Sequence, residues 1–269
     1  MKQRIITGVI GGIIFITLVY LGDIWYSGLI FLLALIGLFE FLRMAKIPPF
    51  SVPGLLSYLL MGGTLWPYLF FGAQVPINFS SLLMSILLLL LFYSVLRKNE
   101  FHIEHVALTI LGALYIGYGF QYMAAMRQEA TGGSFWLTML ILLGIWSTDS
   151  GAYFVGRSMG KTKLWPAISP NKTVEGSIGG LFIAMLIVVG VNQLLIWNHV
   201  SGALPFVQAL GIAFVTGIVA QMGDLVESGM KRHFGVKDSG QIIPGHGGVL
   251  DRFDSLLIVF PTLYLLGLS

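Results

Sequence analysis

Several acidic side chains lie inside or beside long apolar runs, where a carboxylate is costly unless it has a function. They are Asp149, Asp224, Glu227, Asp251 and Asp254. A charge at the centre of a membrane helix costs about 2.5–3.5 kcal/mol on insertion scales, so such residues usually face a cavity and take part in function. A single acid of this kind can instead snorkel to the interface, and we assign that role to Glu40. Four aspartates at the ends of three apolar runs favour a shared site.

Helical spacing groups these acids further. Positions i, i+3, i+4 and i+7 of one helix face are occupied by Asp224, Glu227, Ser228 and Lys231. Asp251 and Asp254 are three residues apart, which predicts a second shared face at a helix N-terminus, where backbone N–H groups are free. Carboxylates from two helices suit Mg²⁺, which usually takes one or two protein carboxylates together with substrate phosphates. The acids therefore predict phosphate chemistry.

Two polar segments, 157–175 and 228–252, supply matching cations and glycines. The first contains Arg157, Lys161, Lys163 and the run Ser169-Pro170-Asn171-Lys172-Thr173-Val174-Glu175-Gly176, and the second contains Lys231, Arg232, Lys237 and Pro244-Gly245-His246-Gly247-Gly248. Glycines let backbone amides approach phosphate oxygens closely. The cations could instead only set topology and bind anionic lipid, a reading that fits Lys161 and Lys163 better than Lys172. His246 could be a simple turn residue, although its glycine neighbours favour a shaped loop.

The composition indicates the elements that hold these residues. Only 10% of the 269 residues are charged and 56% are hydrophobic, whereas a soluble domain carries about 25% charged residues. This argues against a soluble enzyme, a disordered chain and a nucleic-acid binder, and the absence of cysteine removes thiolate-bound metals and thiol nucleophiles. We predict an all-α, polytopic transmembrane helical bundle. Its nine expected spans are 5–22, 24–42, 53–72, 80–96, 106–125, 135–156, 176–197, 205–227 and 253–268.

The basic residues predict the orientation of these spans. With a cytoplasmic N-terminus, fourteen of the fifteen Lys and Arg residues fall in inner segments and only Arg127 lies outside. Nine spans then place the C-terminus outside. Polar and charged residues are also unevenly distributed along the chain. This predicts structural, lipid-facing helices over 1–125 and a catalytic region over 126–269 with cytoplasmic loops 157–175 and 228–252.

Residues 228–254, SGMKRHFGVKDSGQIIPGHGGVLDRFD, resemble the signature of the phosphatidate cytidylyltransferase (CDP-diacylglycerol synthase) family. The segments TDSGAYFVGR, 148–157, and SPNKTVEG, 169–176, are also similar to that family. The resemblance covers 147–254 by motif. Its eleven fixed positions are Ser228, Lys231, Arg232, Lys237, Asp238, His246, Gly247, Gly248, Asp251, Arg252 and Asp254.

The resemblance implies transfer of CMP from CTP to phosphatidic acid, giving CDP-diacylglycerol and pyrophosphate. Together with the spacing, it implies Asp224 and Asp251 as leading Mg²⁺ ligands and Asp254 and Asp149 as further ligands, with a second cation left open. Phosphate clamps and catalytic residues are then Lys172, Lys231, Arg232 and Arg252. The expected substrate-binding residues are Ser169, Asn171, Lys172, Lys237, Asp238, His246, Gly247 and Gly248.

Two other classes of function stay open on the sequence. A cation- or proton-coupled transporter also carries intramembrane acids, although transporters favour midplane sites and repeated halves, and no repeat is present here. A related enzyme that acts on an isoprenoid-ether phosphatidate would share every physical argument. The resemblance further implies a homodimer, and the lack of an N-terminal extension favours a bacterial inner membrane with a cytosolic active site.

Overall fold

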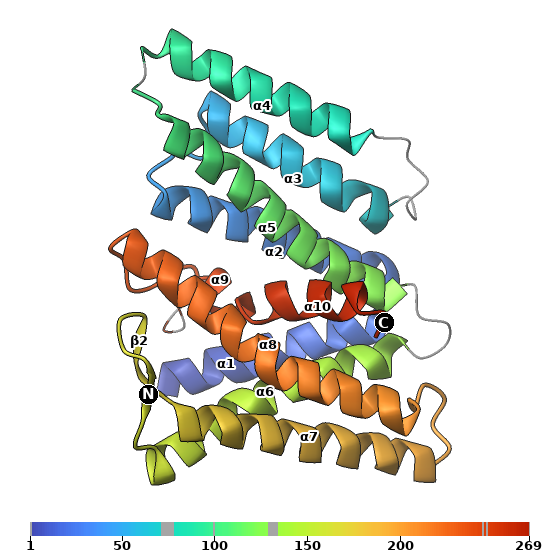
Figure 1. Ribbon diagram of the computed structural model, residues 1–269. Helices are drawn as coiled ribbons and strands as arrows, with labels where there is room; N and C mark the ends of the chain where they lie inside the picture. The colour runs from blue at the N-terminus through green and yellow to red at the C-terminus, as the bar shows by residue number, and fades with distance from the viewer. Residues whose placement is uncertain are drawn as a thin grey trace. The chain divides into compact units, whose positions relative to one another are not determined.

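The computed structural model describes residues 2–70, 78–98, 100–128, 134–243, 245 and 247–268, without the side chains of 2–6, 66–68, 70 and 134. These residues are mostly helical (Figure 1). The helices are α1 Lys2–Leu21, α2 Asp23–Met44, α3 Val52–Phe70, α4 Phe79–Leu96, α5 Ile103–Gln128, α6 Ser134–Met159, α7 Val174–Trp197, α8 Phe206–His233, α9 Leu250–Phe253 and α10 Leu256–Leu265. The strands are β1 Lys163–Trp165 and β2 Ser169–Thr173.

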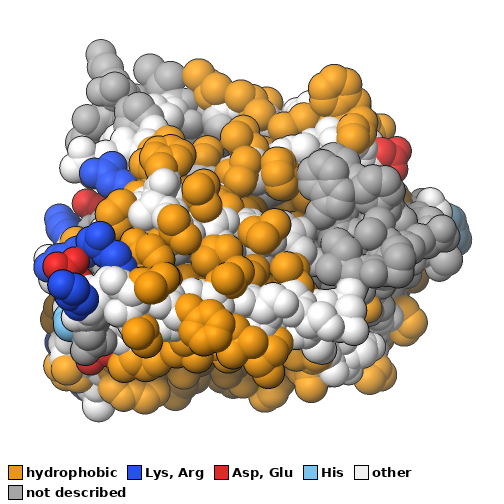
Figure 2. All heavy atoms as spheres, turned by 90° about the horizontal axis from the view of Figure 1, so that it is seen from above, with side chains coloured by type: hydrophobic (Ala, Val, Ile, Leu, Met, Phe, Trp, Pro, Cys, Tyr) orange, Lys and Arg blue, Asp and Glu red, His pale blue; other side chains and the backbone are white. Residues whose placement is uncertain are grey.

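Six of the described helices are long and apolar enough to cross a membrane, which confirms a polytopic membrane protein. They are Asp23–Met44, Phe79–Leu96, Ile103–Gln128, Phe135–Met159, Val174–Trp197 and Phe206–His233. The other three expected spans correspond to shorter apolar helices, Thr7–Leu21, Val52–Leu65 and Leu256–Leu265. Hydrophobic side chains cover much of the face drawn in Figure 2, and Lys and Arg side chains gather at one end of it. The count of nine spans stays a prediction.

The all-α prediction is wrong in one place, because the segment between α6 and α7 forms a small hairpin. Strands β1 and β2 pair antiparallel, with Lys163 opposite Thr173 and Trp165 opposite Ser169. The turn is closed by the Ile168 N–H, which donates to the Trp165 carbonyl at 3.1 Å. Proline interrupts helices, and Pro166 and Pro170 both fall in this segment. The extended backbone of β2 leads directly into α7.

The chain divides into two compact units, each described by itself. Unit 1 comprises Met1–Ala124 and Phe234–Arg252, and unit 2 comprises Ala125–His233 and Phe253–Ser269. The functional division at 125/126, with a catalytic region over 126–269, stays a prediction. Within unit 1, residues 234–252 contact the N-terminal helices. One of these contacts is between Leu250 and α2, where a Cβ on Gly37 would lie 3.2 Å from the Leu250 Cδ2.

Unit 2 is built on a close approach of α6 and α7, which lie side by side in Figure 1. A Cβ added to Gly180 would lie 2.7 Å from the Thr148 carbonyl oxygen, and one added to Gly176 would lie 2.7 Å from the Ala152 carbonyl oxygen. Small residues spaced by four allow such backbone approach between membrane helices. The glycines at 176 and 180 therefore set the distance between the helix that carries Asp149 and the helix that follows Lys172.

Helix α8 completes this unit by packing on α6, α7 and α10. A Cβ on Gly223 would lie 2.8 Å from the Ser255 Cα, and the Ser255 hydroxyl donates to the Ala220 carbonyl at 2.9 Å. These contacts bring the start of α10 against the part of α8 that carries Asp224. The two sequence segments that form unit 2, 125–233 and 253–269, thus meet on α8.

Candidate active site

An ion pair joins the two predicted site residues Lys172, in β2, and Asp224, in α8. The Lys172 Nζ lies 2.6 Å from the Asp224 Oδ2, and the two side chains are 24% and 34% exposed. Lys172 also donates to the Gln221 carbonyl at 3.5 Å. The other oxygen of Asp224, Oδ1, accepts a hydrogen bond from the Ser228 hydroxyl at 3.2 Å, which confirms that these two residues share a helix face. A cation and an anion are therefore held together, and both side chains are partly exposed.

The N-terminus of α7 fixes the backbone next to Lys172. Thr173 is the N-cap residue of this helix, and its Oγ1 accepts the Gly176 N–H at 3.1 Å. Glu175 accepts the backbone N–H groups of Lys161 and Thr162, both at 3.1 Å, and so ties the end of the hairpin to its beginning. An N-cap side chain contributes about 1 kcal/mol to a helix. The position of Lys172 is thus set by capping and hairpin pairing together.

A cavity of about 430 Å³ opens beside this ion pair. Its polar lining comes from two helices and the hairpin: Asp149 and Arg157 from α6, Asn171 and Lys172 from β2, and Asp224 from α8. The backbone of Gly176, in the first turn of α7, also lines it. Because the Gly176 N–H already donates to the Thr173 Oγ1, the positive charge at this cavity comes from the side chains of Lys172 and Arg157. The cavity can therefore hold an anion against Lys172, with carboxylates available for a cation.

Three predicted metal ligands of unit 2 lie within electrostatic reach of one another. Asp224 interacts with both Asp149 and Asp254, and Asp149 also interacts with Lys172. Within the described ranges, no three His, Asp or Glu side chains already converge in the arrangement of a bound metal. The arrangement nevertheless fits a hard cation that takes one or two carboxylates and completes its shell with water and phosphate oxygens.

Two further predicted phosphate clamps of unit 2, Lys231 and Arg232, contact other groups of that unit. Lys231 forms an ion pair with the buried Glu227, four residues before it, as the helical spacing predicted. The Arg232 Nε donates to the Ile168 carbonyl at 3.4 Å, which joins the end of α8 to the hairpin turn. Ser169, at the start of β2, is half-buried and is not in the lining of the cavity.

A second group of predicted residues belongs to unit 1. The Asp251 Oδ2 accepts the Ser239 N–H at 2.9 Å, the Ser239 hydroxyl at 2.9 Å and the Gly248 N–H at 2.8 Å. Gly247 has a φ of 82° and lies against the same carboxylate. Asp251 therefore organises the glycine-rich segment, with the neighbouring Arg252 in the same short helix α9. His246 lies outside the described residues.

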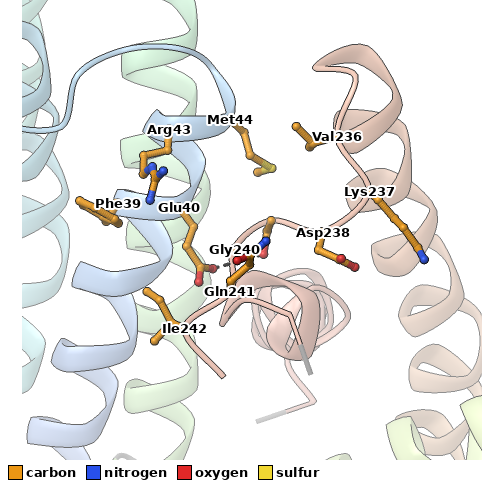
Figure 3. Close-up of a pocket in the computed structure, with 11 residues that line it drawn as sticks. Phe39, Glu40, Arg43, Met44, Val236, Lys237, Asp238, Gly240, Gln241 and Ile242 are labelled. Atoms are coloured by element: carbon orange, nitrogen blue, oxygen red, sulfur yellow. Dashed lines mark hydrogen bonds between the residues drawn. The ribbon is translucent and has the colours of Figure 1, made fainter. Parts of the chain in front are cut away.

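Lys237 and Asp238 line a cavity of about 520 Å³ in this unit, together with Arg43 of α2 (Figure 3). Both predicted substrate-binding side chains are exposed, and so is Arg43. The cationic groups are accompanied by apolar side chains of Phe39, Met44 and Ile242. This cavity combines charged groups of both signs with hydrophobic surface.

Two sequence interpretations are corrected by these contacts. Asp251 and Asp254 do not share a helix face, because α9 ends at Phe253 and α10 begins at Leu256. Glu40 does not snorkel to the interface, since it is only 2% exposed. Its carboxylate accepts backbone N–H groups from Val249 and Leu250, both at 3.0 Å. Glu40 and its partner Ser239 were missed as site residues because periodicity along one helix cannot reveal a partner about 200 residues away.

Comparison with known proteins identifies the family. The model of the cytidylyltransferase family matches residues 2–269. The chain is 47% identical over 268 residues to the phosphatidate cytidylyltransferase of Bacillus subtilis, covering 99% of this chain and 97% of that protein. It is 42% identical over 266 residues to the phosphatidate cytidylyltransferase of Staphylococcus haemolyticus, covering 99% and 98%. With matches at this identity over nearly its full length, the chain belongs to the phosphatidate cytidylyltransferase family.

Proposed function

We propose that this protein transfers CMP from CTP to phosphatidic acid in the membrane, giving CDP-diacylglycerol and pyrophosphate. Family membership over residues 2–269 supports the reaction. The observation in the structure that favours it most is the Lys172–Asp224 ion pair at the cavity beside the start of α7. The lysine offers positive charge to the phosphates of a nucleoside triphosphate, and the aspartate offers a carboxylate to the cation that accompanies it.

In this reaction an oxygen of the phosphatidate phosphate attacks the α-phosphorus of CTP. The bond from that phosphorus to the oxygen of the β-phosphate breaks, and pyrophosphate leaves with the electron pair. Phosphatidate is already an anion, so the step requires no protein nucleophile. What the protein supplies is alignment and fixed positive charge where negative charge develops.

The proposed roles follow the positions of the charges. Lys172, Lys231, Arg232 and Arg252 serve as phosphate clamps, and Ser169, Asn171, Lys237, Asp238, His246, Gly247 and Gly248 as substrate-binding residues. Asp224, Asp149 and Asp254 would hold Mg²⁺, which neutralises phosphate charge in such reactions. Asp251 is retained as a further candidate ligand, although its Oδ2 already accepts three hydrogen bonds.

The proposal includes the membrane setting. We place the N-terminus and the polar segments 157–175 and 228–252 on the cytosolic side, because this puts fourteen of fifteen basic residues inside. We assign the protein to the inner (cytoplasmic) membrane of a bacterium, and the bacterial relatives support the bacterial setting. A homodimer remains part of the proposal on family grounds alone.

The test is label transfer by the purified protein in vesicles that contain phosphatidic acid. With CTP labelled at the α-phosphate, label is expected in the lipid fraction, and with CTP labelled at the γ-phosphate it is expected in pyrophosphate. Failure to label lipid with Mg²⁺ and both substrates present, combined with cation flux across the vesicle, would favour the transporter instead. Competition between diacyl and isoprenoid-ether phosphatidate distinguishes the two lipid substrates.

A further inference from the structure

Glu40 is a buried carboxylate that holds a segment about 200 residues away in the sequence. It lies in α2, is 2% exposed, and uses both oxygens as acceptors. The Val249 N–H donates to Oε1 at 3.0 Å, and the Leu250 N–H donates to Oε2 at 3.0 Å. The Ser239 hydroxyl also lies 3.2 Å from Oε2. All of these groups belong to unit 1, and Figure 3 shows Glu40 pointing from α2 toward the segment around Gly240.

The segment approaches Glu40 so closely that two positions have room only for glycine. A Cβ on Gly240 would overlap the Glu40 Oε1, and a Cβ on Gly248 would overlap both the Glu40 Oε2 and the Ser239 hydroxyl. One turn earlier on α2, Gly37 accommodates the Leu250 side chain. The backbone on both sides of the glycine-rich turn is therefore fitted to this one carboxylate.

Ser239 connects Glu40 to Asp251. Its hydroxyl oxygen lies 2.9 Å from the Asp251 Oδ2 and 3.2 Å from the Glu40 Oε2, and it accepts the Asp251 N–H at 3.3 Å. Asp251 in turn accepts the Gly248 N–H. Removing the acceptors on Glu40 would thus free the backbone at residues 249 and 250 and loosen the hydroxyl that orients Asp251.

Burying a carboxylate is expensive, and an apolar side chain is often the more stable occupant of such a site. A carboxylate here has an evident use, because it can accept two adjacent N–H groups and a hydroxyl at once, which an apolar residue cannot. We propose that Glu40 is a positioning residue, which holds residues 239–240 and 247–251 so that Gly247, Gly248 and Asp251 are aligned for the reaction of CTP. The inference rests on the proposed function for the alignment it serves, whereas the carboxylate-to-backbone contacts are independent of it.

Glu40→Gln is the sharpest variant because it keeps the size of the side chain. Glutamine offers one acceptor oxygen and turns an NH₂ donor toward the N–H of Val249 or Leu250, so one hydrogen bond is replaced by a contact between two donors. We expect kcat per folded molecule to fall by about tenfold to a hundredfold, the size expected when reacting groups shift by a fraction of an ångström to one ångström. Glu100→Gln, on an exposed side chain paired with Arg97, is the matched control and should leave kcat unchanged.

Three readouts separate positioning from a general loss of stability. Backbone amide exchange in 247–251 should become faster in Glu40→Gln, while exchange within α7 stays as in the unchanged protein. The KM for phosphatidate should stay within about twofold of that of the unchanged protein. The reason is that the segment controls the alignment of bound CTP, which affects kcat. Glu40→Asp restores both carboxylate oxygens, although one methylene shorter, and should recover part of the lost kcat.

A double-mutant cycle tests the close approach directly. Gly240→Ala should be strongly harmful on its own, because its Cβ overlaps the Glu40 carboxylate. It should be less harmful in a Glu40→Ala background, which removes the overlapping atoms, so the two effects should not add. Additive effects would contradict the proposed contact.

The inference is overturned if Glu40→Gln keeps the kcat and the exchange protection of the unchanged protein. It is also overturned if kcat per folded molecule is unchanged while only the melting temperature falls, since that is a structural role alone. If the unchanged protein transfers no CMP, the proposed function fails instead. In that case amide exchange still tests the contacts between Glu40 and the backbone of 249 and 250. Unaltered exchange at 247–251 in Glu40→Gln would reject these contacts, and faster exchange would support them.

Discussion

The Lys172 ammonium lies 2.6 Å from the Asp224 carboxylate, so a residue of the hairpin and a residue of α8 form one charged pair. Neither residue is close to the other in the sequence, and the pair exists because β2 runs into α7 and α7 packs on α8. The carboxylate holds the lysine side chain at the lining of the cavity. The lysine can exchange part of that interaction for a phosphate when substrate arrives.

The ion pair predicts that Lys172 and Asp224 act together. Lys172→Ala and Asp224→Asn should each lower CMP transfer by about two to three orders of magnitude, the loss typical for a charged group that stabilises a transition state. The double variant should lose less than the product of the two single losses, because the partners are in contact. The measurement is lipid labelling at saturating CTP. Lys163→Ala, an exposed lysine of the same hairpin outside the cavity lining, is the control and should have little effect.

A magnesium titration should distinguish Asp224 from Asp251. Asp224→Asn should raise the Mg²⁺ concentration needed for half-maximal activity, because Asp224 interacts with the carboxylates of Asp149 and Asp254. Asp251→Asn should mainly lower kcat and speed amide exchange at Ser239 and Gly248, the donors to its Oδ2. If both variants require more Mg²⁺ to the same degree, Asp251 is a ligand as the sequence predicted. If neither does, the metal assignment of Asp224 is wrong.

The contact between α6 and α7 should be sensitive to any added side chain. Gly180→Ala would place a Cβ 2.7 Å from the Thr148 carbonyl oxygen, and overpacking of this kind costs about 1–3 kcal/mol. We expect a lower melting temperature and weaker activity, because Asp149 lies in the displaced helix. Gly190→Ala in the same helix meets nothing within 4 Å and should be neutral or slightly stabilising. Equal thermal stability of the two variants in detergent would argue against this close contact.

Topology can be tested with reporter fusions. We expect an outward-active phosphatase fused after Ser269 to be active, since nine spans with the N-terminus inside place the C-terminus outside. A cytosolic reporter fused within 157–175 should also be active, because that segment contains four of the fifteen basic residues. A cytosolic signal from the fusion after Ser269 would mean an even number of spans.

Local patterns predicted much of this arrangement. Apolar runs located the helices, and the spacing of Asp224 and Ser228 correctly placed both on one face of α8, because a helix has a fixed period. The hairpin and the break between Asp251 and Asp254 were not predicted, since both depend on short irregular backbone. Glu40 was misjudged for a different reason: its burial depends on contacts with 239–250, and a charge near the end of an apolar run looks the same whether water or a distant loop satisfies it.

The most direct test of the account is pyrophosphate release from CTP by the purified protein, measured with and without phosphatidate. Direct transfer predicts release only when both substrates and Mg²⁺ are present, one CDP-diacylglycerol formed for each pyrophosphate, and near loss of both products in Asp224→Asn. Rapid release from CTP alone, with the α-phosphate label retained on the protein, would show a covalent intermediate and contradict the account.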